Sequence, residues 1–224
     1  MQKQDINGII RLLVSAYGDR QWSKRLEPVG ELVQTILSQN TSDTNSRRAF
    51  LSLMNTFGNW NNIALAEEKD IADAIRQGGL ADVKAKYISN VLQVLRRQTT
   101  GLDLSFLKEM EMGEARKWLQ KLPGVGMKTA SCVLLFSLHM PSFPVDTHVY
   151  RVAKRLGLIN MNMSVESAHM EMERITAPQD IYRCHVLLIE HGRKTCKARH
   201  PACGICALAG ICPSYKLYIN EKHA

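Results

Sequence analysis

Lys128 and Asp146 stand at the predicted starts of two consecutive helices, where they could act as a nucleophile and its electrostatic partner. The segment Leu122–Gly126 holds one proline and two glycines, so it cannot form the interior of a helix. Helical composition precedes it over Glu114–Lys121, and an apolar stretch long enough for a buried helix follows over Lys128–Leu138. The pattern predicts a helix, a tight hairpin and a second helix, with main-chain N–H groups able to bind an anion beside Lys128.

Four of the six cysteines lie close together near the C-terminus, with the spacing C-x6-C-x2-C-x5-C. They are Cys196, Cys203, Cys206 and Cys212. Thiolates this close in an intracellular protein are usually metal ligands, and both zinc and iron–sulfur clusters accept four cysteines. The spacing favours iron–sulfur, because zinc sites usually carry two C-x2-C pairs and this segment holds one. Cys132 and Cys184 lie on apolar helix faces and are predicted to be buried as small hydrophobic residues.

The chain is basic, with a formal net charge of +8 over 224 residues and a pI of about 9.3. This balance favours a polyanionic partner, and nucleic acid more than a membrane. Arg193, Lys197 and Arg199 flank the first clustered cysteine, where they form either a phosphate-binding loop or a solvated basic loop. The sequence has no apolar run of about 18 residues and no signal peptide, so we expect an intracellular protein, cytoplasmic or at the nucleoid if prokaryotic.

Helical periodicity extends over most of the remaining chain. The first segment reads as an amphipathic helix, with Asp5 as its N-cap and Gly18 as its end. No segment shows sustained period-2 alternation, and no low-complexity linker marks a domain boundary. We therefore predict an all-α protein of about ten helices.

Five segments together resemble the endonuclease III family of DNA glycosylases, within the helix-hairpin-helix superfamily. They are LPGVGMKTA, PVDTHVYRV and HGRKTCKARHPACGICALAGIC, with weaker matches at ILSQNTSD and GGLADVKAK. The resemblance implies a 4Fe–4S cluster on the four cysteines. It also implies two helical domains flanking a DNA-binding cleft: residues 22–140 form a helical-barrel domain with the hairpin. Residues 1–21 and 141–224 form a discontinuous domain with the cluster.

The resemblance further implies a base-excision-repair enzyme that is both a glycosylase and an abasic-site (AP) lyase. Lys128 would form a Schiff base at the sugar C1′, Asp146 would stabilise the oxocarbenium character there, and β-elimination would cut the strand 3′ to the lesion. Double-stranded DNA with damaged bases or abasic sites is the expected partner, an oxidised pyrimidine the expected target, and a monomer the expected state. The alternatives are a mismatch or alkylated-base glycosylase and a non-catalytic DNA-binding protein.

Base excision requires the target base to leave the duplex, so side chains must fill the gap. By resemblance, Gln39 or Asn40 is one wedge and Leu80 is the other, although Leu80 could instead be a buried loop leucine. Met127 departs from the family, which commonly has arginine there. The other expected DNA contacts are the hairpin and its helix, namely Leu122, Gly124, Val125, Gly126 and Thr129, together with His148, Arg151, Arg193, Lys197 and Arg199. His148 and Arg151 could equally order Asp146 or lie on the surface, and Asp146 could be a plain helix cap.

Overall fold

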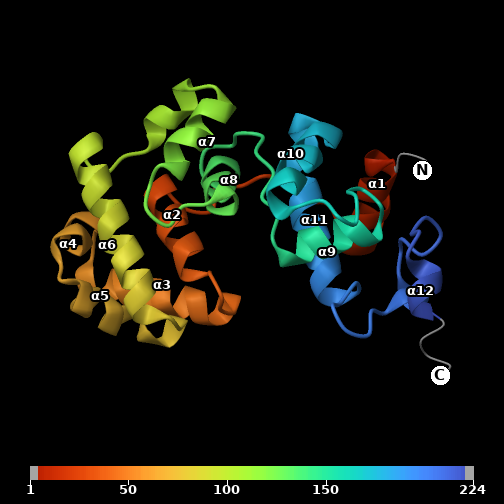
Figure 1. Cartoon of the computed structure of the whole chain (residues 1–224), viewed down its shortest axis with the longest axis horizontal. Helices are drawn as coiled ribbons and strands as arrows, with labels where there is room; N and C mark the ends of the chain where they lie inside the picture. Colours follow the sequence, from red (N-terminus) through yellow and green to blue (C-terminus); the bar gives the residue numbers. More distant parts are fainter. Residues whose placement is uncertain (1–4, 220–224) are drawn as a thin grey trace. The chain divides into compact units, whose positions relative to one another are not determined.

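A computed structural model describes residues 5–219, and these residues are helical with no strand (Figure 1). The all-α prediction is confirmed; the described residues hold twelve α-helices, against the ten or so expected. In chain order the helices are α1 (Ile6–Tyr17), α2 (Pro28–Leu37), α3 (Asp43–Phe57), α4 (Trp60–Leu65), α5 (Glu68–Ile75), η1 (Arg76–Gly78), α6 (Ala81–Gln98), η2 (Ser105–Glu109), α7 (Met112–Gln120), α8 (Met127–Phe136), α9 (Thr147–Arg155), α10 (Val165–Ile175), η3 (Pro178–Asp180), α11 (Ile181–Lys194), η4 (Cys203–Ile205) and α12 (Tyr215–Ile219), where η marks a 3-10 helix.

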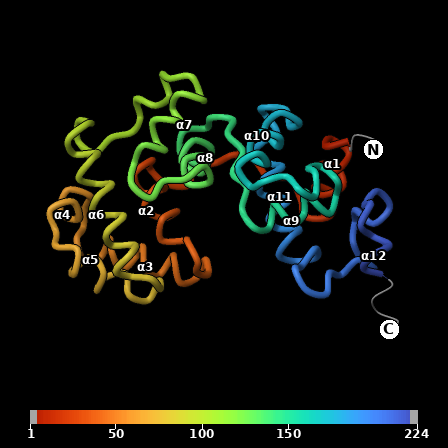
Figure 2. The backbone as a smooth tube through the Cα atoms, viewed as in Figure 1, coloured from red at the N-terminus to blue at the C-terminus, as the bar shows by residue number. Residues whose placement is uncertain are grey.

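The chain divides into two compact units. One is the continuous segment Lys24–Met140, which runs from α2 to α8. The other joins the N-terminal segment up to Ser23 to the segment from Pro141 onward. Figure 2 traces these segments by colour along the chain. The sequence had placed the two boundaries near residues 22 and 140.

The continuous unit is built around α2 and α8, which pack against each other. Pro28 begins α2, where its missing N–H removes no helical hydrogen bond. Nearly every residue of α8 is buried, which explains why its sequence is apolar on all sides. Helices α3, α5 and α6 complete the core, and the inward faces of these helices carry isoleucine, leucine and alanine side chains.

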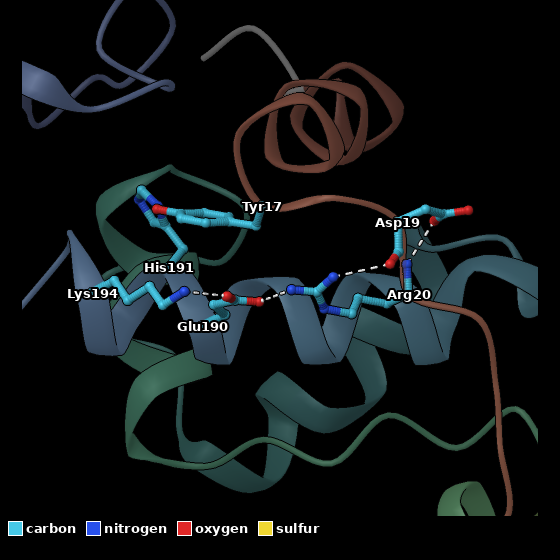
Figure 3. Close-up of polar contacts among 6 residues, drawn as sticks. All are labelled: Tyr17, Asp19, Arg20, Glu190, His191 and Lys194. Atoms are coloured by element: carbon cyan, nitrogen blue, oxygen red, sulfur yellow. Dashed lines mark hydrogen bonds and ion pairs between the residues drawn. The ribbon is translucent and has the colours of Figure 1, made fainter.

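The discontinuous unit is held together by contacts between α1 and α11. The Tyr17 hydroxyl lies 2.9 Å from Nδ1 of His191 and 2.8 Å from Oγ1 of Thr195. Arg20 and Lys194 each donate to a carboxylate oxygen of Glu190 at 2.6 Å (Figure 3). The N-terminal segment is therefore fastened to the helix that leads into the clustered cysteines.

The predicted ends of the first helix are confirmed. Oδ1 of Asp5 accepts from the Asn7 N–H at 3.0 Å, and Gly18 ends the helix with a φ of 81°. No helix in residues 5–219 combines the length and the apolar character needed to cross a membrane.

Candidate functional site

The predicted hairpin lies between α7 and α8. The Leu122 N–H bonds to the Leu119 carbonyl at 3.0 Å, and the Val125 N–H bonds to the Leu122 carbonyl at 3.2 Å, which closes a tight turn. The side chains of Leu122 and Val125 are buried in the core. Any ligand of this hairpin must therefore meet its main chain.

The two hairpin glycines serve different purposes. Gly124 has a φ of 73°, and a Cβ there would lie 2.8 Å from the ring of Tyr87. Glycine is required at this position by the fold itself. Gly126 has an ordinary φ of −90°, and within the described residues a Cβ there would meet no atom within 4 Å. Internal packing therefore does not require glycine at position 126.

Lys128 is the second residue of α8 and is half-buried. The N-cap of this helix is Gly126, which has no side chain to accept from the first-turn N–H groups. Met127 is half-buried beside it, and Thr129 is buried. The start of α8 thus combines uncapped amide donors, a positive macrodipole end and an amine in one place.

The segments that carry the two expected wedges share an unusual backbone. Asn40 and Leu80 have φ values of 52° and 53°, a left-handed conformation that residues other than glycine rarely adopt. Asn40 is exposed, Gln39 is half-buried, and Leu80 is 55% exposed. The alternative of a buried loop leucine at position 80 is therefore wrong.

Asp146 is the N-cap of α9, and its Oδ1 accepts from the Val149 N–H at 2.8 Å. Side chains from α10 and α11 form hydrogen bonds with the main chain of residues 143–144, just before Asp146. Glu173 accepts from the Phe143 N–H at 2.8 Å, and Nδ1 of His169 and of His185 lie 2.8 Å from the carbonyl oxygens of Phe143 and Pro144. The carboxylate thus lies at the end of a buried, hydrogen-bonded segment, half-exposed itself. Sequence reasoning missed these three anchors, because a histidine or glutamate that contacts a distant main-chain group has no local signature.

Arg151 and Arg155 attach α9 to the clustered cysteines. Arg151 donates to the carbonyls of Gly192 at 2.8 Å and Cys196 at 3.1 Å, and its Nη2 lies 3.3 Å from Nδ1 of His148. Burial lowers the pKa of Arg151. Arg155, which sequence reasoning missed, donates to Sγ of Cys196 at 3.4 Å and to the carbonyl of Lys197 at 2.7 Å. Through these hydrogen bonds both guanidinium groups hold α9 against α11 and the cysteine loop.

The four clustered cysteines line one cavity together with Arg155, His191 and apolar side chains. Four cysteine thiolates around one cavity are a ligand set that an iron–sulfur cluster accepts. Burial raises the pKa values of the Cys206 and Cys212 thiols, and the neighbouring cysteines raise them further, so bound iron would be needed to hold these sulfurs as thiolates.

The other cysteines and the basic residues are also located. Cys132 and Cys184 are buried, as predicted, and burial raises the pKa of Cys184 to about 12. Arg193, Lys197 and Arg199 are exposed around the cysteine loop. Their charges remain accessible to a polyanion.

Comparison with known proteins gives two family matches. Residues 33–178 match the HhH-GPD superfamily of base excision DNA repair proteins, and residues 196–212 match the iron–sulfur binding domain of endonuclease III. The second match begins and ends at the first and last clustered cysteines.

Relatives and solved structures agree with these matches. Endonuclease III of Sulfolobus acidocaldarius is 37% identical over 186 residues, covering 82% of this chain and 81% of that protein. A protein of Arabidopsis thaliana described as a DNA glycosylase is 41% identical over 162 residues, but this chain spans only 55% of its length. The structure of a trapped covalent intermediate of endonuclease III with DNA has a TM-score of 0.83 at 27% identity, covering 98% of this chain and 99% of that one.

Proposed function

We propose specific roles for Lys128, Asp146 and the wedge residues on the premise that this chain belongs to the endonuclease III family, within the HhH-GPD superfamily, and is a DNA glycosylase and AP lyase of base excision repair with a 4Fe–4S cluster. The observation that carries these roles is the amine of Lys128 at the uncapped start of α8, directly after the hairpin. A phosphate bound by the hairpin amides would bring the neighbouring sugar within reach of that amine.

Lys128 acts as the nucleophile. Its neutral amine attacks C1′, the N-glycosidic bond breaks, and the departing base takes the bonding electrons and acquires a proton. The sugar ring opens to an imine between C1′ and Nζ. Loss of the C2′ proton then expels the 3′ phosphate and cuts the strand.

Asp146 stabilises the positive charge that develops at the sugar as the base leaves. Its hydrogen bond to Val149 and the buried segment behind it favour a fixed carboxylate, which needs little reorganisation during the reaction. Helix capping and catalysis are compatible here, since the cap uses Oδ1 of the carboxylate.

Exposed Leu80 and Asn40, or its neighbour Gln39, fill the space left by the extruded nucleotide. The hairpin main chain from Leu122 to Gly126 binds phosphate without reading sequence. Exposed Arg193, Lys197 and Arg199 add phosphate contacts around the cysteine loop, whereas Arg151 contributes by holding α9.

Cys196, Cys203, Cys206 and Cys212 hold the cluster, and when bound it supplies a cross-link that fixes their loop. The substrate is double-stranded DNA carrying an oxidised pyrimidine, and the enzyme acts on it as a monomer. Met127, beside the nucleophile, is the residue through which this substrate range can differ from that of relatives.

Borohydride trapping with abasic-site DNA tests the nucleophile directly. Wild-type protein should form a covalent adduct, and Lys128→Ala should form none. Lys117→Ala, which removes an exposed lysine from α7, serves as the control and should trap like wild type. Failure of cluster-loaded wild type to trap, or full trapping by Lys128→Ala, would contradict the role of Lys128.

A panel of lesion duplexes, assayed with and without alkali, tests the substrate. Oxidised pyrimidines should be excised fastest, and the strand should be cut without alkali. Faster excision of a mismatched or alkylated base would reassign the enzyme within its superfamily.

A further inference from the structure

Lys84 on α6 is a buried lysine that the mechanism above does not use. Its side chain is among the largest that are fully buried, with 2% of the residue exposed. Nζ donates to two main-chain carbonyls, of Leu37 at 2.8 Å and of Gly78 at 2.9 Å. Burying an ammonium group is unfavourable, so a position that only filled the core would be better served by leucine or methionine.

The two carbonyls lie at the ends of two different helices. Leu37 is the last residue of α2, and Gly78 is the last residue of η1. Carbonyl groups at helix ends lack intrahelical partners and carry partial negative charge, so one ammonium group can satisfy both. Burial lowers the pKa of Lys84, and the two hydrogen bonds to carbonyl groups offset the cost of burying its charge.

Each of these helix ends leads directly into a wedge segment. Asn40 follows Leu37 by three residues, and Leu80 follows Gly78 by two. The main-chain N–H of Lys84 also bonds to the Leu80 carbonyl at 3.0 Å, so Lys84 contacts the Leu80 segment twice. Leu80 has a left-handed backbone, which leucine does not favour and which persists only where surrounding contacts determine it.

We propose that Lys84 is a positioning residue that ties the two wedge segments together, so that Asn40 and Leu80 enter the base stack at one fixed spacing. This inference rests on the wedge roles proposed above. Loss of the tie leaves the chemical groups intact but lets the segments move independently, which slows extrusion of the base from a duplex. A substrate without a base stack does not require the tie.

The test uses the full-length, cluster-loaded protein with Lys84→Met. Lys86→Met is the matched control, because it removes an exposed charge from the same helix. Base excision from a lesion duplex is measured at saturating enzyme, and borohydride capture is measured on a single-stranded abasic oligonucleotide. Lys84→Met should slow duplex excision about tenfold, as expected for losing hydrogen bonds from a charged group, and leave single-strand capture unchanged. The control should match wild type on both substrates.

An equal loss on both substrates would overturn the inference and make Lys84 a folding residue only. Should Lys84→Met fail to fold, Lys84→Gln keeps a donor in a shorter side chain, and amide hydrogen exchange replaces the activity assay. Exchange should accelerate together in residues 38–40 and 78–81. Unchanged exchange, or acceleration in one segment alone, would also overturn the tie.

A double-mutant cycle separates this inference from the wedge roles themselves. In an Asn40→Ala/Leu80→Ala background, adding Lys84→Met should cause no further loss on duplex DNA. If the wedge substitutions slow excision and Lys84→Met adds its full effect, the positioning role of Lys84 is wrong, whereas the wedge roles of Asn40 and Leu80 are supported. If the wedge substitutions change nothing, the wedge roles fail and the tie fails with them.

Discussion

Helices α8 and α9 begin in opposite ways. Gly126 starts α8 without a side-chain cap, whereas the Asp146 carboxylate caps α9 through the Val149 N–H. The first helix is apolar on all sides, and the second is strongly amphipathic. The two helix starts therefore differ in their hydrogen bonding: the first amides of α8 have no side-chain cap, and a first-turn amide of α9 holds the Asp146 carboxylate.

The surroundings of the two helix starts differ in the same sense. Helix α8 is fixed by apolar packing, with Ala130, Val133 and Leu134 in the core. Helix α9 also buries apolar side chains, and it adds polar contacts through Arg151 and Arg155 to the main chain of α11 and of the cysteine loop. Substitutions at the start of α8 should therefore change DNA affinity and stability by different amounts. Substitutions at the start of α9 should do the same for the rate of base excision and stability.

The largest expected effect is at the carboxylate of α9. Asparagine caps helices as well as aspartate does, so Asp146→Asn should leave the melting temperature nearly unchanged. It should slow base excision on the order of 10²–10³-fold, because the charge that stabilises the sugar is lost. Single-turnover excision and thermal unfolding measure the two quantities.

Asp146→Ala is the companion variant. It should show the same loss of excision and an additional loss of about 1 kcal/mol in stability from the missing cap. A variant Asp146→Asn with nearly full activity would reduce Asp146 to a capping residue.

The next effect concerns Arg155, which fastens α9 to the cysteine loop. Arg155→Met keeps the length of the side chain but removes its hydrogen bonds to Cys196 and Lys197. We expect a loss of roughly 2–3 kcal/mol in stability, because the cysteine loop loses hydrogen bonds from a charged donor. The visible absorbance of the cluster should also bleach faster on dilution. Lys154→Met, at the neighbouring position of the same helix, is the control and should keep the cluster as wild type does.

These two helices also show what the sequence can and cannot predict. The hairpin was predictable because proline and glycine within five residues act on the local backbone. The capping role of Asp146 was also predictable, because a helix cap involves residues that are close in sequence. The C-x6-C-x2-C-x5-C spacing favoured a cluster before any geometry was known, since ligand spacing is itself local in sequence.

The supporting contacts were not predictable. His185 reaches the carbonyl of Pro144 across 41 residues, and Lys84 reaches that of Leu37 across 47. Neither contact leaves a periodic or compositional signal, because a buried polar side chain has the same sequence appearance as an exposed one. The left-handed backbone at Leu80 is likewise set by its surroundings, since leucine has no intrinsic preference for it.

The hairpin glycines allow a sharper separation at α8. Gly124→Ala should destabilise the protein by about 2 kcal/mol, because of its positive φ and the contact with Tyr87. Gly126→Ala should change stability by less than about 1 kcal/mol, because alanine restricts the unfolded chain but is a poorer N-cap than glycine. DNA affinity should nevertheless fall for Gly126→Ala at every sequence tested. Undiminished DNA binding by Gly126→Ala would remove the argument that this glycine permits close approach of a phosphate.

The smallest expected effect is at Met127, the first residue of α8. Met127→Arg adds a cation beside the hairpin, and one further phosphate contact should steepen the dependence of log affinity on log salt by about one unit. The same cation lies at the positive end of the helix, which should lower stability by about 0.5 kcal/mol. Binding titrations with undamaged duplex at several salt concentrations measure the slope. A steeper slope with the wild-type order of lesion preference would assign Met127 to affinity alone, whereas a changed order would place specificity at the start of α8.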